Sequence, residues 1–178
     1  MHKVYLGLGS NLGNRQQNIE DAVRLVQERV GQVVRQSSLM ESEPWGFESC
    51  HNFLNAVILC QTTKSPHEVL TLTQQIERDL GRIKKSTRLP VEMSTRLSVE
   101  KSTRLPVEKS TRLPVEKTTR LPVSQEASGR QYADRPIDID ILLYDDLTVD
   151  DPDLKIPHPL MHKRDFVMKP LREIYQPD

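Results

Sequence analysis

Apolar and polar positions follow the chain in a pattern that predicts four strands and two long helices. Apolar runs at residues 4–8, 33–40 and 53–61, and an alternating run at 135–144, are typical of strands. Apolar residues at helical spacing across 19–30 and 69–83 predict two amphipathic helices. A short strand at 154–156 and a final helix at 166–174 complete the predicted elements.

The ends of the two long helices carry their own signals. Asn14 followed by Gln17, and Ser65 followed by Glu68, are the residue pairs of capping boxes. Gly31 is suited to the position just past the end of the first helix. The order β-α-β-β-α-β predicts an α+β, ferredoxin-like fold, with helices on one face of a mostly antiparallel sheet.

Residues 85–124 interrupt this pattern with five eight-residue repeats, three of which are the identical KSTRLPVE. The period fits no coiled coil, and the repeated prolines would interrupt a continuous helix. We predict a long low-complexity insertion, extended or disordered, before the fourth strand of a single domain that spans residues 1–178. Four Lys and five Arg against four Glu give the repeats a net charge of +5, so a basic tether for an acidic partner is the alternative.

Composition narrows the class of protein. The formal net charge of the 178 residues is zero, which gives no case for a nucleic acid or an anionic membrane as partner. No apolar run approaches the roughly 20 residues of a membrane span. Gly7 occurs before any long apolar run, so we expect no signal peptide. Cys50 and Cys60 have no metal-binding spacing and are interpreted as reduced thiols. We therefore expect a cytoplasmic protein without a nucleic-acid or membrane partner, and we also expect a monomer.

The alternating run at 135–144 carries the strongest candidate chemistry. Side chains of a strand alternate between faces, so Asp138 and Asp140 share one face, opposite Ile137 and Ile139. Asp is unfavourable in strands, and two adjacent carboxylates repel unless a cation lies between them. Mg²⁺ binds through one or two carboxylates together with water and phosphate oxygens, and Arg135 adds a phosphate-binding fork. The alternative is a solvated face on an edge strand.

Two other polar residues, Asn55 and His158, each allow two interpretations. Asn55 interrupts a strand that is apolar on both faces, and is either satisfied by nearby backbone or contacts a ligand. His158 lies between two prolines and is either an ordinary loop residue or a constrained ligand contact. From the pattern alone, Gln74 and Glu77 are solvated helix residues. The glycine-rich turn at 7–13 matches neither a dinucleotide fingerprint nor a P-loop.

Five motifs, in order and spacing, resemble those of the 6-hydroxymethyl-7,8-dihydropterin pyrophosphokinase family. They are GSNLG at 9–13, PWG at 44–46 with FLNA at 53–56, the helix residues 74–82, RPIDID at 135–140, and IPHP at 156–159 with Arg164 and Phe166. The resemblance covers nearly the whole chain outside the repeats. It implies an ATP-dependent enzyme of folate biosynthesis that uses two Mg²⁺ to transfer pyrophosphate from ATP to the pterin hydroxymethyl group, releasing AMP.

The resemblance also implies roles for single residues. Asp138 and Asp140 would bind both metal ions, and with Arg82 and Arg135 would form the catalytic group. The implied ATP contacts are Gln74, Glu77, Lys84, Ile141, His158 and Arg164. The implied pterin contacts are Ser42, Trp45, Phe53, Asn55 and Phe166, with the ring stacked between the two phenylalanines.

The sequence departs from the family at three places. Lys84 stands where the family often has Arg, and Phe53 where it often has Tyr. The repeats lie inside the family's catalytic loop, between Lys84 and Arg135. Lengthening a flexible loop from ~10 to ~50 residues costs only ~1.4 kcal/mol of closure entropy, so lid closure is affected more than folding. The second functional class is a non-catalytic ligand-binding protein that displays a basic repeat.

Overall fold

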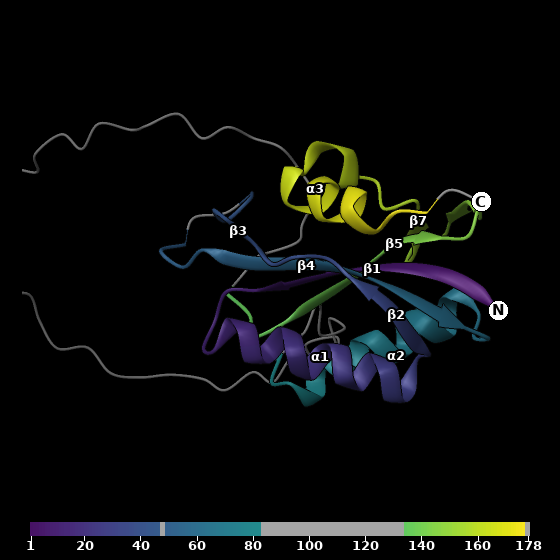
Figure 1. Ribbon diagram of the computed structural model, residues 1–178, viewed down its shortest axis with the longest axis horizontal. Helices are drawn as coiled ribbons and strands as arrows, with labels where there is room; N and C mark the ends of the chain where they lie inside the picture. The colour runs from purple at the N-terminus through teal and green to yellow at the C-terminus, as the bar shows by residue number, and fades with distance from the viewer. Residues whose placement is uncertain (47–48, 83–133, 177–178) are drawn as a thin grey trace, which may run out of the picture. The chain divides into compact units, whose positions relative to one another are not determined.

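The computed structural model of the protein describes residues 1–46, 49–82 and 134–176. These residues form a mixed α/β fold in which helices cover an antiparallel sheet (Figure 1). The repeats at 85–124 and the residue Lys84 lie outside the described residues.

The main sheet has the strand order β2-β4-β1-β5, and every pairing in it is antiparallel. Its members are β1 (His2–Ser10), β2 (Gln32–Gln36), β4 (Phe53–Thr62) and β5 (Asp138–Tyr144). The strand β3 (Met40–Ser42) pairs with β4 as well. A separate two-stranded sheet joins β6 (Val149–Asp150) to β7 (Lys155–Ile156).

The single strand predicted at 33–40 is wrong, because the structure divides this region into β2 and β3. The break occurs at Ser37, which is buried between the two strands and contacts Val57 of β4. The Ser37 N–H donates to the Val57 carbonyl, and the Ser37 hydroxyl accepts from the Val57 N–H, both at 2.9 Å. A side-chain oxygen thus satisfies a backbone donor of β4, and regular pairing resumes only at Met40.

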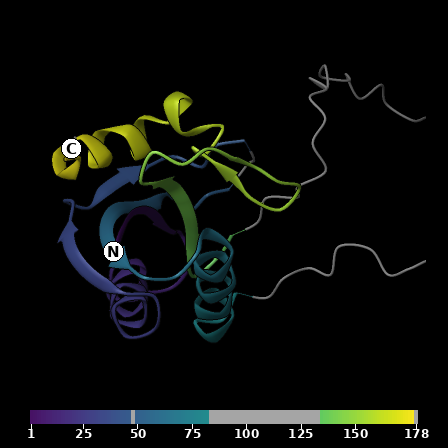
Figure 2. The ribbon, with the colours of Figure 1, turned by 90° about the vertical axis from the view of Figure 1, so that its right-hand side faces the viewer.

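The helices α1 (Arg15–Arg29) and α2 (Pro66–Asp79) lie together on one face of the sheet, as Figures 1 and 2 show. The predicted starts are confirmed: Asn14 accepts from the Gln17 N–H, and Ser65 and Glu68 form a reciprocal capping box. The helix α3 (Asp165–Ile174), preceded by a 3₁₀ turn at Met161–Lys163, covers the opposite face. The prediction that helices lie on one face therefore holds for α1 and α2 but not for α3.

Two hydrophobic clusters fill the layers on either side of the sheet. The cluster under α1 and α2 contains Ile137, Ile139 and Ile141 of β5 and its approach, each at most 5% exposed. The cluster under α3 contains Leu142 of the same strand. The alternation predicted for this strand is confirmed, and it places Asp138 and Asp140 on the face that α3 covers.

Gly31 lies just past the last residue of α1, as predicted, but for a reason other than a left-handed turn. A Cβ atom at Gly31 would lie 2.2 Å from the Gln61 carbonyl oxygen of β4. The glycine therefore permits a close approach of two backbones at the point where α1 passes into β2.

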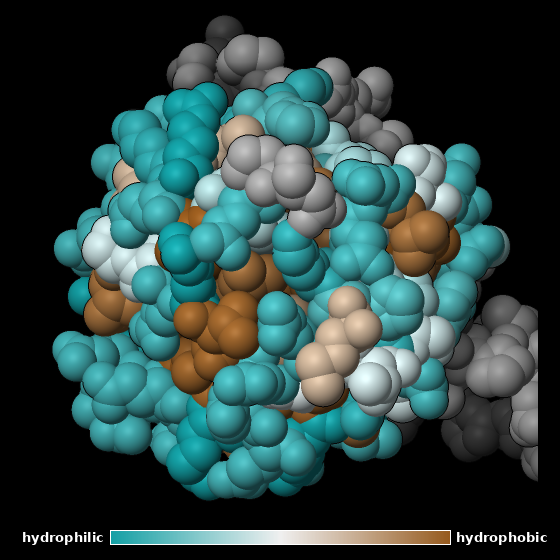
Figure 3. Space-filling view, turned by 45° about the vertical axis from the view of Figure 1, so that its right-hand side comes forward, coloured by the Kyte–Doolittle hydropathy of each residue, from teal (hydrophilic) through white to brown (hydrophobic). Residues whose placement is uncertain are grey.

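The face of the molecule shown in Figure 3 is mainly hydrophilic, with hydrophobic residues exposed among polar ones. Trp45 and Tyr175 are among the large hydrophobic side chains that the described residues expose. No helix in the described ranges is long and apolar enough to cross a membrane.

Candidate active site

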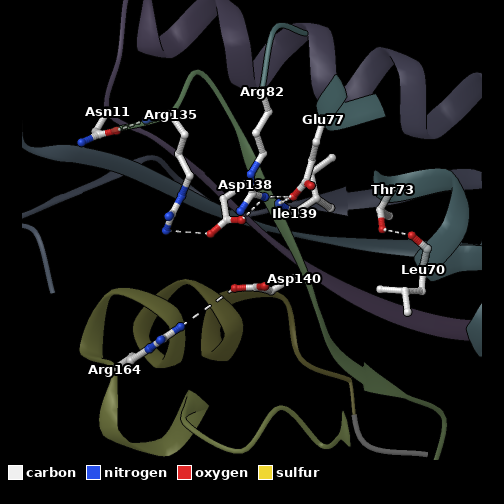
Figure 4. A network of polar contacts seen from close by, with 10 residues as sticks. All are labelled: Asn11, Leu70, Thr73, Glu77, Arg82, Arg135, Asp138, Ile139, Asp140 and Arg164. Carbon is white, nitrogen blue, oxygen red and sulfur yellow. Dashed lines mark hydrogen bonds and ion pairs between the residues drawn. The ribbon is translucent and has the colours of Figure 1, made fainter. Parts of the chain in front are cut away.

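A network of polar contacts surrounds Asp138, at the start of β5 (Figure 4). Its Oδ1 atom lies 2.5 Å from Nη1 of Arg82, which follows α2, and its Oδ2 atom lies 2.9 Å from Nη2 of Arg135. Arg82 and Arg135 are 53 residues apart in the sequence, and both contact this one carboxylate. The arrangement places two cations beside the predicted metal-binding strand.

Asp140 lies on the same face of β5 and is less fully paired. Its nearest cation is Nη1 of Arg164, 3.9 Å from its Oδ2 atom. Desolvation by the surrounding protein and the neighbouring charge of Asp138 raise the pKa of Asp140 to about 6. Asp140 is therefore the carboxylate of the pair whose charge is less fully offset by the cations of the described residues.

Glu77 lies beneath this pair, on the inner side of α2. It is 4% exposed, so the interpretation of Glu77 as a solvated helix residue is wrong. Its Oε1 atom accepts a 2.8 Å hydrogen bond from the Ile139 N–H and also pairs with Nη1 of Arg82. Burial and the nearby charge of Asp138 raise the pKa of Glu77 to about 7, although Arg82 acts in the opposite direction.

A cavity opens beside the carboxylates, between the sheet and α3, with about 600 Å³ of space that is partly open to solvent. It brings together the predicted pterin contacts with four of the predicted phosphate and metal residues. Those in its wall are Ser42, Trp45, Phe53, Asn55, Phe166, Arg135, Asp138, Asp140 and Arg164. One cavity thus joins an aromatic compartment to a charged one.

The arginines of the cavity lie over its aromatic rings. The Arg135 guanidinium carbon is 5.4 Å from the centre of the Phe53 ring. That of Arg164 is 4.6 Å from the Trp45 ring and 5.9 Å from the Phe166 ring. Arg164 is 9% exposed, and its Nε atom is buried without a hydrogen-bond partner among the described residues. A buried, incompletely satisfied guanidinium is suited to receive an oxygen of an anionic ligand.

Asn55 is buried in the wall of the cavity with its amide nitrogen satisfied locally. Its Nδ2 atom donates to the Met40 carbonyl at 3.1 Å and to the Ser42 hydroxyl at 2.9 Å. These two bonds fix the orientation of the side chain against β3. The structure therefore supports the backbone-satisfied interpretation for the nitrogen, while the residue still lines the cavity.

Four predicted ATP contacts of the described residues lie outside the cavity wall: Glu77, described above, and Ile141, Gln74 and His158. The side chain of Ile141 is buried in the cluster under α1 and α2. Gln74 is half-buried on α2. His158 is half-buried: its N–H donates to the Leu142 carbonyl at 3.0 Å, and its Nδ1 atom accepts from the Leu160 N–H at 3.3 Å.

Asn11 is a site residue to which the sequence analysis gave no role of its own. Its Oδ1 atom accepts from the Arg135 N–H at 2.8 Å, and its own N–H donates to the Arg135 carbonyl at 3.2 Å. Its Nδ2 atom donates to Asp134 at 2.8 Å. The signal was present in the glycine-rich turn, but the partner is 124 residues away in the sequence.

The donor set fits a hard divalent cation that shares its shell with a ligand. The described residues contain no group of three or more His, Cys, Asp or Glu side chains placed to hold a metal ion by themselves. Two carboxylates on one strand face, as Asp138 and Asp140 are, suit Mg²⁺ when phosphate and water supply the remaining oxygens. With arginines on both sides, the site is of the class that binds and transfers phosphate groups.

Comparisons with known proteins agree with this class of site. The family model for 7,8-dihydro-6-hydroxymethylpterin-pyrophosphokinase (HPPK) matches residues 5–97 and 102–176. A 2-amino-4-hydroxy-6-hydroxymethyldihydropteridine pyrophosphokinase of Porphyromonas gingivalis is 39% identical over 96% of this chain and 89% of its own length. The protein of the same name from Aquifex aeolicus is 32% identical over 98% of this chain and 81% of its own length.

A solved structure shows the same kind of fold. The crystal structure described as HPPK-DHPS in complex with substrates superposes with a TM-score of 0.55 at 12% identity. The match covers 97% of this chain and 40% of that one, and it bears on the fold alone. From the family model and the relatives, the chain belongs to the HPPK family of ATP-dependent pyrophosphokinases.

Proposed function

We propose that the protein transfers the pyrophosphoryl group of ATP to 6-hydroxymethyl-7,8-dihydropterin in folate synthesis, giving AMP and the pterin diphosphate. The observation that carries the proposal is the cavity that joins an aromatic compartment to two carboxylates flanked by arginines. The match to the HPPK family and the names of the relatives point to the same substrates.

The aromatic compartment is the proposed pterin site. Phe53 and Phe166 supply flat faces that suit a bicyclic ring, and both lie in the cavity wall. Asn55 contacts the polar edge of the ring, in the orientation that Met40 and Ser42 impose on its amide. Trp45 completes the entrance, where 40% of its surface is exposed.

The charged compartment is the proposed site of the triphosphate. Arg135 and Arg164 bind non-bridging phosphate oxygens from the cavity wall, and Arg82 approaches from the end of α2. Lys84, which lies outside the described residues, adds a charge near the leaving phosphate. The nucleotide itself contacts Gln74, His158 and the backbone of Ile141.

Asp138 and Asp140 would hold the two Mg²⁺ ions of the reaction, which supply charge neutralisation at the phosphate oxygens. The residues of this chain bind and orient the two substrates, so that the pterin hydroxyl faces the β-phosphorus in line with the leaving AMP. The arginines stabilise the charge that develops on the transferred group. Transfer is direct, without a phosphorylated enzyme.

We also propose a description of the fold, of the domain organisation, and of the location and partners of the protein. The strand order β2-β4-β1-β5, with α1 and α2 on one face, supports a ferredoxin-like description of the fold. Residues 1–178 form a single pyrophosphokinase domain, into which 85–124 is inserted. The protein acts as a cytoplasmic monomer on small molecules rather than on a nucleic acid or a membrane.

The experiment is a turnover assay with ATP, MgCl₂ and the hydroxymethyldihydropterin, followed by ³¹P NMR. We expect one AMP and one pterin diphosphate for each ATP consumed, and Asp138→Asn is the inactive control. Formation of ADP with a singly phosphorylated pterin would overturn the proposed bond cleavage. Binding of the pterin without turnover would instead support the non-catalytic, ligand-binding class.

A further inference from the structure

The edge position of β5 leaves part of its backbone without a neighbouring strand. In the order β2-β4-β1-β5, this strand has β1 on one side only. The N–H of Ile139, between the two carboxylate residues, is bonded to the Glu77 side chain at 2.8 Å. A carboxylate of α2 therefore takes the place of a strand partner at the point where the site is built.

The same carboxylate oxygen also orients Arg82. Nη1 of Arg82 contacts Oε1 of Glu77 and, at 2.5 Å, Oδ1 of Asp138. Figure 4 shows the three side chains converging, with the Ile139 backbone at the same point. Any displacement of Glu77 would thus move both a cation of the site and the strand that carries the two carboxylates.

Glu77 itself has no access to the cavity. It is 4% exposed and is absent from the cavity wall, whereas Asp138, Asp140 and Arg164 are part of that wall. A ligand in the cavity meets these residues and not Glu77. Its position is suited to holding the Ile139 backbone and Arg82 in place.

We propose that Glu77 is a positioning residue that fixes Arg82 and the Asp138–Asp140 strand. The inference rests on the proposed function for its kinetic consequences, but its geometry is independent of the substrate. Glu77→Gln separates the two tasks, because the amide oxygen still accepts from Ile139 while the charge that holds Arg82 is lost.

The test is a double-mutant cycle with Glu77→Gln and Arg82→Ala. We expect Glu77→Gln to lower kcat about 10- to 100-fold while the KM for ATP changes less than about twofold. In the Arg82→Ala background the same substitution should change kcat less than about threefold. Asp79→Asn is the matched control: it removes a carboxylate from the same helix, where Asp79 pairs with Arg29 and is 52% exposed.

Two readouts do not depend on turnover. The Kd for binding of the Mg²⁺ complex of α,β-methylene-ATP to the protein can be measured by Trp45 fluorescence. In Glu77→Gln this Kd should stay within about twofold of the wild-type value. Amide exchange at Ile139 should accelerate at least about tenfold in Glu77→Ala, which removes the acceptor, but not in Glu77→Gln.

The outcomes separate the two proposals. An inactive wild-type enzyme that binds the analogue refutes the proposed function, and the binding and exchange readouts still test Glu77. A tenfold weaker Kd in Glu77→Gln overturns the inference, because it indicates direct nucleotide contact. A full kcat effect of Glu77→Gln in the Arg82→Ala background, or loss of the fold in Glu77→Gln, also overturns it.

Discussion

Replacing Asp140 by Asn is expected to stabilise the metal-free protein while it abolishes turnover. The pKa of Asp140 is raised from its usual 3.8 to about 6, so the folded state disfavours the ionised carboxyl. Two pKa units correspond to about 3 kcal/mol at full strength. Because 41% of the Asp140 side chain is exposed, solvent screening reduces this to about 1 kcal/mol.

The pH dependence fixes the sign of this effect. The folded pKa lies above the unfolded one, so the penalty is fully present above about pH 6 and disappears below about pH 4. Asp140→Asn should therefore raise the Tm by about 2–4 °C at pH 8. At pH 3, where wild-type Asp140 is mostly protonated in both states, the two proteins should have nearly the same Tm.

Asp138→Asn is the matched comparison on the same face of the same strand. Asp138 pairs with Arg82 and Arg135, and its loss removes a partner from two cations. We expect this variant to be destabilised by about 1–2 kcal/mol and also to be inactive. Both variants are measured by thermal unfolding in EDTA and by AMP formation with Mg²⁺. A lower Tm for Asp140→Asn at pH 8, or an undiminished advantage at pH 3, would refute the reasoning.

Four further predictions concern Cys60, Gly31 and Asn55. Burial raises the pKa of Cys60 to about 11, so at pH 8 a disulfide reagent should label only the exposed Cys50 until the protein unfolds; two rapidly labelled thiols in the native state would contradict this. Since the unfolded Cys60 thiol loses its proton first, stability should fall by about 2–3 kcal/mol as pH rises from 9 to 11, less if Cys60 is replaced by Ala. Gly31→Ala should cost about 1–3 kcal/mol in urea unfolding, because its Cβ would meet the Gln61 carbonyl, and unchanged stability would show that the backbones separate freely. Asn55→Leu should raise the KM for the pterin at least about tenfold and leave the KM for ATP within about twofold; equal effects on both would place Asn55 outside the pterin site.

Local sequence signals were sufficient where the cause of the structure is local. Ser65 and Glu68 are three residues apart and satisfy each other's backbone, so their pattern predicts the start of α2 correctly. The alternation at β5 depends on the strand period alone, and it predicts correctly that Asp138 and Asp140 share one face.

Predictions failed where a distant group decides the structure. Glu77 is buried because it accepts from the Ile139 N–H, 62 residues further along the chain. Ser37 divides a continuous apolar run because its hydroxyl satisfies Val57, 20 residues away. Helix and strand periods contain no information about such pairs, so these residues carried no local sign of their role.

The two ends of the connection between α2 and β5 are each fastened within the described part of the protein. Arg82 is bound to Glu77 and Asp138 at one end, and Arg135 to Asn11 at the other. Because these contacts set where the chain leaves and re-enters the site, the number of residues between them is a nearly independent variable. One octad more or fewer in this connection is therefore expected to change folding stability little, because even doubling the length of a loop costs only about 0.6 kcal/mol of closure entropy.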